Sequence, residues 1–259
     1  MKMLKKHYKF SIYAFAIVLF VSGVFTQSCI AKDDAYTTFI QANQFYKSTN
    51  YSKAILLYNK AVSLGFTPGG LYYNLGNAYY RNGNLGKAIV SYLKAQQLLP
   101  RDGDVLENLN IARGQTVDKV GSSEPPAALR QFLFLYYNFS LDELLWITSF
   151  LIALLFISLS VYTFFPYSLI KSIFKVTAVI LIIIGSAAGA KFYHVSSHSI
   201  AVVVAKQAIV RAGPGASYAE MFVVHNGTEI KILEKKDGSA KIRVDKKKGW
   251  IDINDVDII

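Results

Sequence analysis

A set of small and aromatic residues recurs in this chain at an interval of about 34 residues. The second copy maps onto the first as follows: Gly76 onto Ala42, Tyr79 onto Phe45, Ala88 onto Ala54, Tyr92 onto Tyr58, and Ala95 onto Ala61. Leu75 and Pro100 complete the second copy, whereas Gln41 stands in the first copy where Leu75 stands in the second. Small residues at such positions let the two helices of a pair approach closely, and the aromatic rings fill the remaining space. We expect Ala42 and Gly76 to pack against Ala54 and Ala88, so the pattern predicts stacked helical pairs.

This spacing and residue order resemble the tetratricopeptide repeat. A stack of such repeats forms a concave surface that holds a peptide or a partner helix, so the resemblance implies a binding protein. A further helix is expected to begin near Asp102 or Asp104, because acidic residues favour a helix N-terminus. It would run through Leu106, Leu109 and Ile111 and cap the second repeat.

The repeat register also identifies the side chains that would face the concave groove. They are Tyr36, Phe39, Asn43, Tyr46, Tyr73, Asn77 and Tyr80, with Arg81 beside them. Asparagine can both donate to and accept from a peptide backbone, and tyrosine offers apolar area with a polar tip. The pattern therefore predicts a groove for an extended polypeptide, although the same residue types would also suit packing between repeats.

Three apolar windows account for a mean hydropathy of +0.30. Residues 10–25 follow four lysines and precede a short polar stretch, which is typical of a secretory signal. Residues 144–165 carry no charge and are long enough to cross a bilayer. Residues 176–190 form a shorter window, which would span a membrane only if the flanking lysines reach the interface. The alternative for this third window is a buried helix of a soluble domain.

The lysines predict a topology for these spans. Lys171 and Lys175 lie between the second and third windows, and four lysines precede the first. Both positions should therefore face the cytoplasm. The polar segments 32–140 and 192–259 would then share the opposite side of the membrane.

Cys29, the only cysteine, follows the first apolar window. Cleavage after Ser28 or Ala31 is favoured over lipid attachment at Cys29, because Thr26 and Gln27 do not fit a lipoprotein signal; retention as an uncleaved anchor is also open. A single cysteine excludes a disulfide within the chain.

The net charge of +11 does not indicate nucleic-acid binding, because the excess of basic residues is spread over the chain. The densest run, 246–248, precedes Gly249 in a predicted hairpin turn, where a solvated lysine tip is the simpler explanation. We therefore expect protein partners rather than nucleic acid.

The last sixty residues alternate as strands do. The runs 201–210, 229–234, 241–244 and 250–253 are separated by turn signals, and the layout predicts an SH3-like β-barrel of five short strands. Its marker residues are Arg211, Gly213, Pro214, Gly227, Gly249 and Trp250. These stretches are similar to bacterial SH3 domains, although Ala240 stands where such domains often have tryptophan.

The order of these parts resembles the BatE branch of the Bat (aerotolerance) family. The resemblance rests on residues 71–80, residues 108–113, the membrane hairpin and the Gly249-Trp250-Ile251 end of the barrel. It implies a bacterial inner-membrane protein, with its soluble parts in the periplasm, that works with von Willebrand A-type partners and a MoxR-type ATPase in tolerance of oxygen or stress.

The predicted architecture is multidomain, combining α-helical, membrane and β parts. It consists of a signal peptide or anchor at 1–31, a tetratricopeptide repeat domain at 32–113, a linker and interfacial segment at 114–140, a transmembrane helical hairpin at 141–193, and an SH3-like barrel at 199–259.

No catalytic, cofactor or metal site is predicted. The four histidines lie in different contexts, and the turn 83–86 lacks the Lys-Ser/Thr ending of a phosphate loop. Three function classes follow: a non-enzymatic scaffold for protein–protein interaction, a peptidoglycan-binding sensor or anchor, and a transporter component. The third is least favoured because the spans carry no internal charge.

Overall fold

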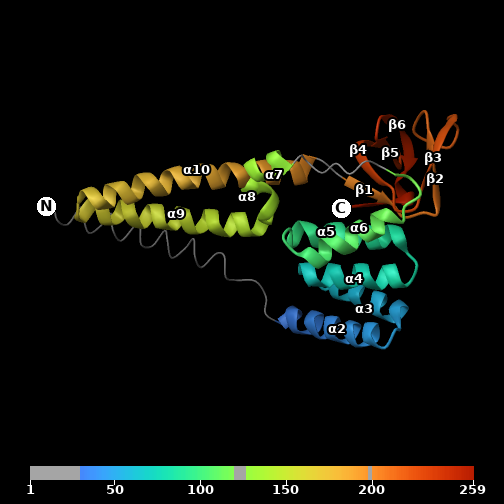
Figure 1. The fold of residues 1–259 in the computed structure, drawn as a ribbon, viewed down its shortest axis with the longest axis horizontal. Helices are drawn as coiled ribbons and strands as arrows, with labels where there is room; N and C mark the ends of the chain where they lie inside the picture. Colours follow the sequence, from blue (N-terminus) through green and yellow to red (C-terminus); the bar gives the residue numbers. More distant parts are fainter. Residues whose placement is uncertain (1–29, 120–126, 198–199) are drawn as a thin grey trace. The chain divides into compact units, whose positions relative to one another are not determined.

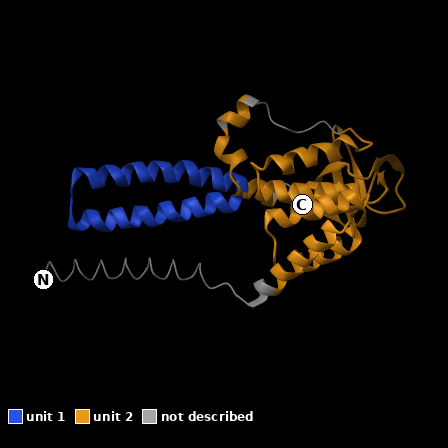
Figure 2. Ribbon diagram, turned by 60° about the horizontal axis from the view of Figure 1, so that its bottom comes forward, with its two compact units in different colours: residues 1–29, 141–191 blue, residues 30–140, 192–259 orange. Residues whose placement is uncertain are grey.

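The structure, a computed structural model, describes residues 30–119, 127–197 and 200–259. The predicted signal, with Cys29, therefore lies outside the described residues. The described residues divide into two compact units (Figure 2). One unit contains Leu141–Lys191, and the other joins Ile30–Ser140 to Phe192–Ile259. The repeats and the C-terminal strands thus belong to the same unit, although the apolar segment separates them in sequence.

Five antiparallel-paired helices build the repeat stack, in layers that follow the chain order (Figure 1). They are α2 (Ile30–Lys47), α3 (Tyr51–Ser63), α4 (Gly69–Arg81), α5 (Leu85–Leu98) and α6 (Gly103–Gly114). The Asp102 carboxylate accepts hydrogen bonds from the backbone N–H groups of Asp104 and Val105 and so caps α6. The helical stack, and the further helix that begins near Asp102, are as the sequence predicts.

The residues predicted to pack the repeats are mostly buried. Ala42, Ala54, Tyr58, Ala61, Leu75, Gly76, Ala88, Tyr92, Ala95 and Pro100 are buried, and Phe45 and Tyr79 are half-buried. Gly76 makes its closest approach to the Tyr92 ring, where an added Cβ would lie 2.6 Å from a ring carbon. The expected neighbour was Ala88, so the residue that requires glycine here is aromatic.

Helix α6 turns a different face to the stack from the one expected. Ile111 is 46% exposed, whereas Val105, Leu109 and Ala112 are fully buried. Residues four and seven positions after Val105 share its helix face, and this face excludes Ile111.

Two apolar helices, α9 (Leu141–Phe164) and most of α10 (Ser168–Ser197), make up the unit that contains Leu141–Lys191. Both helices are long and apolar enough to cross a membrane, and only 22% and 11% of their apolar windows are buried within the chain. Such exposure is unlike that of a soluble core helix. Helix α10 has 30 residues, so Lys171 and Lys175 lie in its first turns rather than in a link between spans. Two short helices, α7 (Ala127–Phe132) and α8 (Phe134–Asn138), occupy the segment predicted to be interfacial.

The C-terminal part is one antiparallel sheet of seven strands in the order β3-β2-β6-β5-β4-β1-β7. The strands are β1 (Ile200–Val203), β2 (Gln207–Arg211), β3 (Glu220–His225), β4 (Glu229–Lys236), β5 (Ser239–Val244), β6 (Lys247–Asp252) and β7 (Val256–Ile258), with a short 3-10 turn, η1 (Ile253–Asp255), before the last. The sequence predicts five strands. The single run 201–210 is two strands. β3 carries too little alternation to be recognised, and β7 has only three residues.

The strands close around a small apolar core. It contains Val203, Val210, Ile230, Ile242 and Ile251, among others. Ala240 also lies in this core and is fully buried. The residue that replaces a tryptophan of related domains therefore points into the sheet's interior and not toward a ligand surface.

Candidate functional site

An asparagine in the first repeat joins three helices. The side-chain oxygen of Asn43 on α2 accepts a hydrogen bond from the Tyr58 hydroxyl on α3 at 2.6 Å, and another from the Asn74 amide on α4 at 3.0 Å. Burial, with a smaller contribution from Tyr46, raises the pKa of Tyr58 well above its usual range. The hydroxyl therefore remains a donor at physiological pH.

The same arrangement returns in the second repeat. Asn77 accepts from the Tyr92 hydroxyl at 2.7 Å and from the Asn108 amide on α6 at 3.4 Å. Each of these three residues lies 34 positions after its counterpart. The oxygens of Asn43 and Asn77 are thus used between repeats, whereas within the described residues their amide N–H groups have no acceptor. These N–H groups are the part of each asparagine that remains free to bind a ligand.

Several other residues of the predicted groove also contribute to packing. Phe39 lies between the rings of Tyr58 and Phe66, at centroid distances of 6.0 and 5.3 Å. The Tyr73 hydroxyl accepts from the Asn108 amide at 3.0 Å, and the Tyr80 hydroxyl accepts from the Gln115 amide. These contacts support the packing interpretation of Phe39, Tyr73 and Tyr80, whereas the groove interpretation stays a prediction.

The remaining predicted groove residues are more open. Tyr36 is 53% exposed, Arg81 is exposed, and Tyr46 is half-buried beside the Tyr51 ring at 5.5 Å. Neither Tyr36 nor Arg81 has a hydrogen-bond partner among the described side chains. Tyr36 still contacts the Phe66 ring at 5.7 Å, so Arg81 is the better probe of a groove, because changing it disturbs the repeat packing least.

The marker residues predicted for the barrel include two glycines in close contacts and a tryptophan on the outside of the sheet. Gly213 supports the Tyr218 ring, which an added Cβ would meet at 2.4 Å, and Gly249 lies equally close to Val210. Trp250 is half-buried, outside the apolar core, with the Lys241 ammonium 5.8 Å from its ring centroid. It therefore covers the outside of the sheet.

Arg211 lies at the point where β2 meets β6 and pairs with Trp250 in register. Its guanidinium donates to Glu220 at 3.4 Å, and its buried Nε has no partner among the described residues. Pro214 is half-buried in the adjoining turn.

Strand β1 contributes to two apolar cores, which the sequence does not reveal directly. Val203 and Ala201 pack in the barrel, whereas Val202 packs against Ile89 and Leu93 of the repeat stack. All three β1 residues are fully buried. An uninterrupted run of buried residues in a short strand indicates burial on both faces. The uninterrupted apolar run at 201–203 could therefore have predicted that another element covers the outer face of this strand.

Two glycines bring the repeats and the barrel into close contact. An added Cβ at Gly86, the second residue of α5, would lie 2.5 Å from the Val203 carbonyl oxygen. At Gly227, which also has a φ of +86°, it would meet the Thr116 methyl at 2.8 Å and the Ile89 side chain at 3.1 Å. We call this contact between α5, the residues after α6 and the barrel the repeat–barrel joint.

Asn226 is the central polar residue of the repeat–barrel joint. Its side-chain oxygen accepts from the Gly86 N–H at 2.7 Å, and its amide donates to the carbonyl oxygens of Val204 and Ala205. On the same side, Arg113 donates to both carboxylate oxygens of Glu229. A bidentate pair of this kind fixes orientation as well as distance.

Asp118 completes the joint from the chain that follows α6. Its carboxylate accepts from the His225 backbone N–H at 2.7 Å and from the Thr228 hydroxyl at 2.6 Å, and lies 3.1 Å from His225 Nδ1. Burial raises the pKa of this carboxyl, but the hydrogen bonds from Thr228 and His225 outweigh burial and lower it overall. The ionised carboxylate therefore holds the barrel turn.

Comparison with known families agrees with both parts. Residues 71–102 match the tetratricopeptide repeat. Residues 206–256 match the bacterial SH3 domain. No curated protein matches the chain significantly. Both families are typically non-catalytic binding modules, so the chain carries two modules of the binding kind beside two helices that could span a membrane.

Metal-ligating residues are scattered over the described part of the chain. No group of three or more histidine, cysteine, aspartate or glutamate residues gathers there. His225 Nδ1 lies 3.1 Å from the Asp118 carboxylate, within the repeat–barrel joint.

Proposed function

We propose that this chain is a non-enzymatic inner-membrane scaffold. In this proposal, α9 and α10 anchor the protein, and the repeats and the barrel bind partner proteins in the periplasm. The observation that carries the proposal is the repeat–barrel joint. It unites two binding modules in one unit, which suits a scaffold that presents two surfaces in a fixed relation.

The joint also supports the shared location of both modules. Arg113 and Asp118 precede the apolar helices, whereas Glu229 and His225 follow them. Residues that bond to each other must lie on the same side of a membrane, and a hairpin of two spans returns the chain to the side it left. The periplasm is the proposed side because Lys171 and Lys175 favour the cytoplasm for the opposite end of the hairpin.

The proposed partners are proteins of the Bat type, including von Willebrand A-type proteins, with a role in tolerance of oxygen or stress. This part of the proposal rests on the resemblance in the order of segments. The repeats would take an extended polypeptide through the free N–H groups of Asn43 and Asn77, with Tyr36, Tyr46 and Arg81 beside them.

Co-purification from detergent-solubilised membranes tests the groove. Arg81→Glu should remove the captured partners without unfolding, because Arg81 is exposed and without hydrogen-bonded partners among the described residues. The matched control is Lys60→Glu, an equal charge reversal at an exposed residue of α3 outside the predicted groove. Equal capture by wild type and both variants would contradict a groove at this position.

A peptidoglycan-binding anchor is the alternative function. It is favoured by the bacterial SH3 match and by exposed apolar side chains on the barrel, with Tyr218 at 48% and Met221 at 56% exposure. Sedimentation with purified sacculi distinguishes the two functions. The full chain is the proper sample, because an isolated barrel would expose Val202 where the repeats now cover it. Saturable co-sedimentation that Tyr218→Ala abolishes would favour the anchor over the scaffold.

A further inference from the structure

The charge of the repeat stack is concentrated in a way that the whole-chain balance hides. From Ala35 to Arg101 there is no aspartate or glutamate, while seven lysines and arginines occur in the same stretch. Six of the seven form pairs separated by 34 residues: Lys47 with Arg81, Lys53 with Lys87, and Lys60 with Lys94. The repeats therefore present basic side chains in register, without internal carboxylates to neutralise them.

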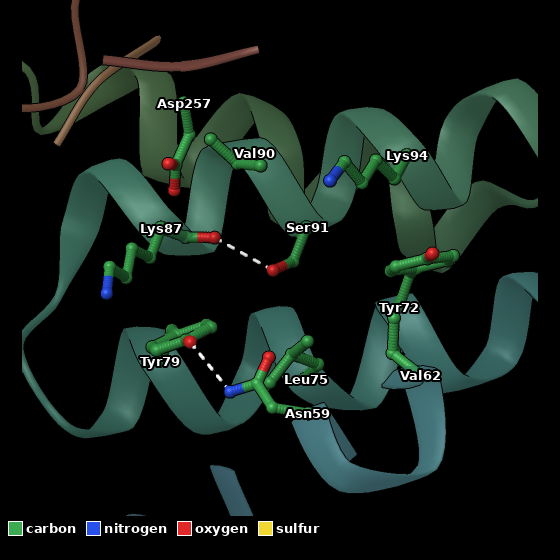
Figure 3. Close-up of a pocket in the computed structure, with 10 residues that line it drawn as sticks. All are labelled: Asn59, Val62, Tyr72, Leu75, Tyr79, Lys87, Val90, Ser91, Lys94 and Asp257. Carbon is green, nitrogen blue, oxygen red and sulfur yellow. Dashed lines mark hydrogen bonds between the residues drawn. The ribbon is translucent and has the colours of Figure 1, made fainter. Parts of the chain in front are cut away.

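A cavity of about 340 Å³ lies between two of these lysines (Figure 3). This volume is at the lower end of the range of about 300–1,000 Å³ that is usual for ligand pockets. Its lining comes from α3, α4, α5 and β7 and consists of Asn59, Val62, Tyr72, Leu75, Tyr79, Lys87, Val90, Ser91, Lys94 and Asp257. None of the residues predicted for the concave groove is among them, so this is a separate site.

The two lysines are held over aromatic rings. The Lys87 ammonium lies 5.8 Å from the Tyr79 ring centroid, and the Lys94 ammonium lies 5.9 Å from that of Tyr72. Neither lysine forms an ion pair with any described residue. In Figure 3 the lysines flank Ser91 along α5, and the two tyrosines face them from α4. Cation–π contact orients the ammonium groups without neutralising them, so both remain available to an anion.

The cavity also offers groups that suit a peptide backbone. The Tyr79 hydroxyl accepts a hydrogen bond from the Asn59 amide at 3.0 Å, which leaves its own proton to donate. The Asn59 side-chain oxygen has no donor among the described residues. Leu75 and Val90 supply apolar lining between these polar groups. A donor and an acceptor beside two cations favour a polypeptide over a simple anion or a flat lipid surface.

From these contacts we propose that the cavity between α4 and α5 binds an acidic, extended polypeptide segment of a partner protein. Residues seven apart on a helix are separated by about 10 Å along its axis. An extended polyproline-type chain spans about 9 Å in three residues. Carboxylates three residues apart can therefore reach Lys87 and Lys94 together.

A substitution of Asp257 should change peptide affinity in the opposite direction from a substitution of the lysines. Its side chain lies beside Val90 at one end of the cavity and is the single carboxylate of the lining. It opposes an acidic ligand, so Asp257→Asn should tighten binding, whereas a loss of either lysine charge should weaken it. Opposite effects from these substitutions are not expected of a general loss of folding.

The experiment uses the full chain in a neutral detergent and a fluorescent peptide with glutamate at every third position in a proline-rich background. Lys87→Gln combined with Lys94→Gln should weaken binding about tenfold, since each exposed charge pair contributes a factor of a few. The matched control is Lys53→Gln with Lys60→Gln, which removes the equivalent charges of the first repeat, outside the cavity. It should change affinity by less than about threefold.

Three results would overturn the proposal. The first is equal weakening by both double variants, which would mean general charge attraction rather than a site. The second is equal binding of a peptide with glutamine in place of glutamate. The third result compares two kinds of nanodisc. If the wild-type chain binds the peptide in phosphatidylcholine nanodiscs but not in nanodiscs that contain phosphatidylglycerol, the cavity would be occupied by the membrane surface. Arg81→Glu, which tests the groove of the proposed function, should leave peptide affinity unchanged, so the two proposals fail separately.

Discussion

At the scale of single residues, glycines that approach another part of the chain set the geometry of this protein. Gly86 and Gly227 lie on opposite sides of the repeat–barrel joint, and each leaves less space than a Cβ needs. Gly86 has no unusual backbone angle, so its requirement is contact alone. A substitution that improves helix propensity is therefore expected to be harmful at this residue.

Gly86→Ala should lower the melting temperature, because the methyl group would overlap the Val203 carbonyl oxygen at 2.5 Å and overpacking typically costs about 1–3 kcal/mol. Gly70→Ala is the matched control. Gly70 is also the second residue of its helix, α4, but nothing lies within 4 Å of its added Cβ. Alanine should be neutral or stabilising there by up to about 1 kcal/mol. Thermal unfolding that shows equal effects for both variants would contradict the joint.

Asp118 gives the joint a dependence on pH. Its folded-state pKa lies below the unfolded value of about 3.9, so its stabilising contribution is complete above about pH 4 and is lost as the pH falls through the folded pKa. The stability difference between wild type and Asp118→Asn should therefore shrink as the pH falls below about 4.

Chemical denaturation at several pH values measures this difference. Asp104→Asn is the control, since Asp104 is exposed on α6 and its side chain holds no part of the barrel. A stability difference for Asp118→Asn that does not change below about pH 4 would show that the carboxylate is not ionised in the joint.

At the scale of elements, β1 is the piece that connects the two modules. Its alternate side chains enter different cores, so neighbouring valines have different roles although both are fully buried. The strand alternation of side-chain direction explains this division. Strand β1 therefore packs against the barrel core with one face and against the repeat stack with the other.

Val202→Ala and Val203→Ala should each destabilise by about 2 kcal/mol, because each removes two buried methyl groups and leaves a cavity. The affected regions should differ. Hydrogen exchange should rise in α5 and β1 for Val202→Ala, and in the central strands β4 and β5 for Val203→Ala. The same exchange pattern in both variants would mean that β1 does not divide the two cores.

The local sequence patterns predicted the helices and strands well, but they did not predict the contacts between these elements. The 34-residue register located the helices of the stack, because close packing of Ala54 and Ala88 restricts residue size. The hydrogen bonds that Asn43 and Asn77 accept from other helices, and the repeat–barrel joint, were not predicted, since Asn74 and Asn226 carry no signal of their partners in the sequence. Likewise, β3 was missed because apolar residues occupy both of its faces: Phe222 and Val224 pack in the barrel core, whereas Met221 and Val223 are exposed, so the strand shows no alternation.

The groove residues show the same limit. Asn77 was assigned to ligand binding from its register, yet its oxygen is bonded to Tyr92 and Asn108. Asn77→Ala would leave the Tyr92 hydroxyl without its acceptor, which costs about 1–3 kcal/mol. Loss of partner binding in this variant would therefore not separate ligand contact from packing, whereas Arg81 does.

At the scale of the whole molecule, the chain leaves the larger unit at Ser140 and returns to it at Phe192. Between these points lie two helices that are each long and apolar enough to cross a membrane, and two crossings would return the chain to the side it left. Such a connection is required if the repeats and the barrel are to contact each other beside a membrane. The hairpin is thus consistent with the joint on topological grounds, apart from any charge argument.

Alkaline phosphatase fusions test this topology, because the enzyme becomes active only after export from the cytoplasm. Fusions after Gly121 and after Ile259 should both be active, since the first apolar segment would carry the repeats across and α9 and α10 would return the chain to the same side. A fusion after Tyr167, between the two spans, should be inactive, because Lys171 and Lys175 favour the cytoplasm. Two inactive outer fusions would reverse the orientation but keep the joint. One active and one inactive outer fusion would place Arg113 and Glu229 on opposite sides of the membrane, and the repeat–barrel joint itself would then be excluded.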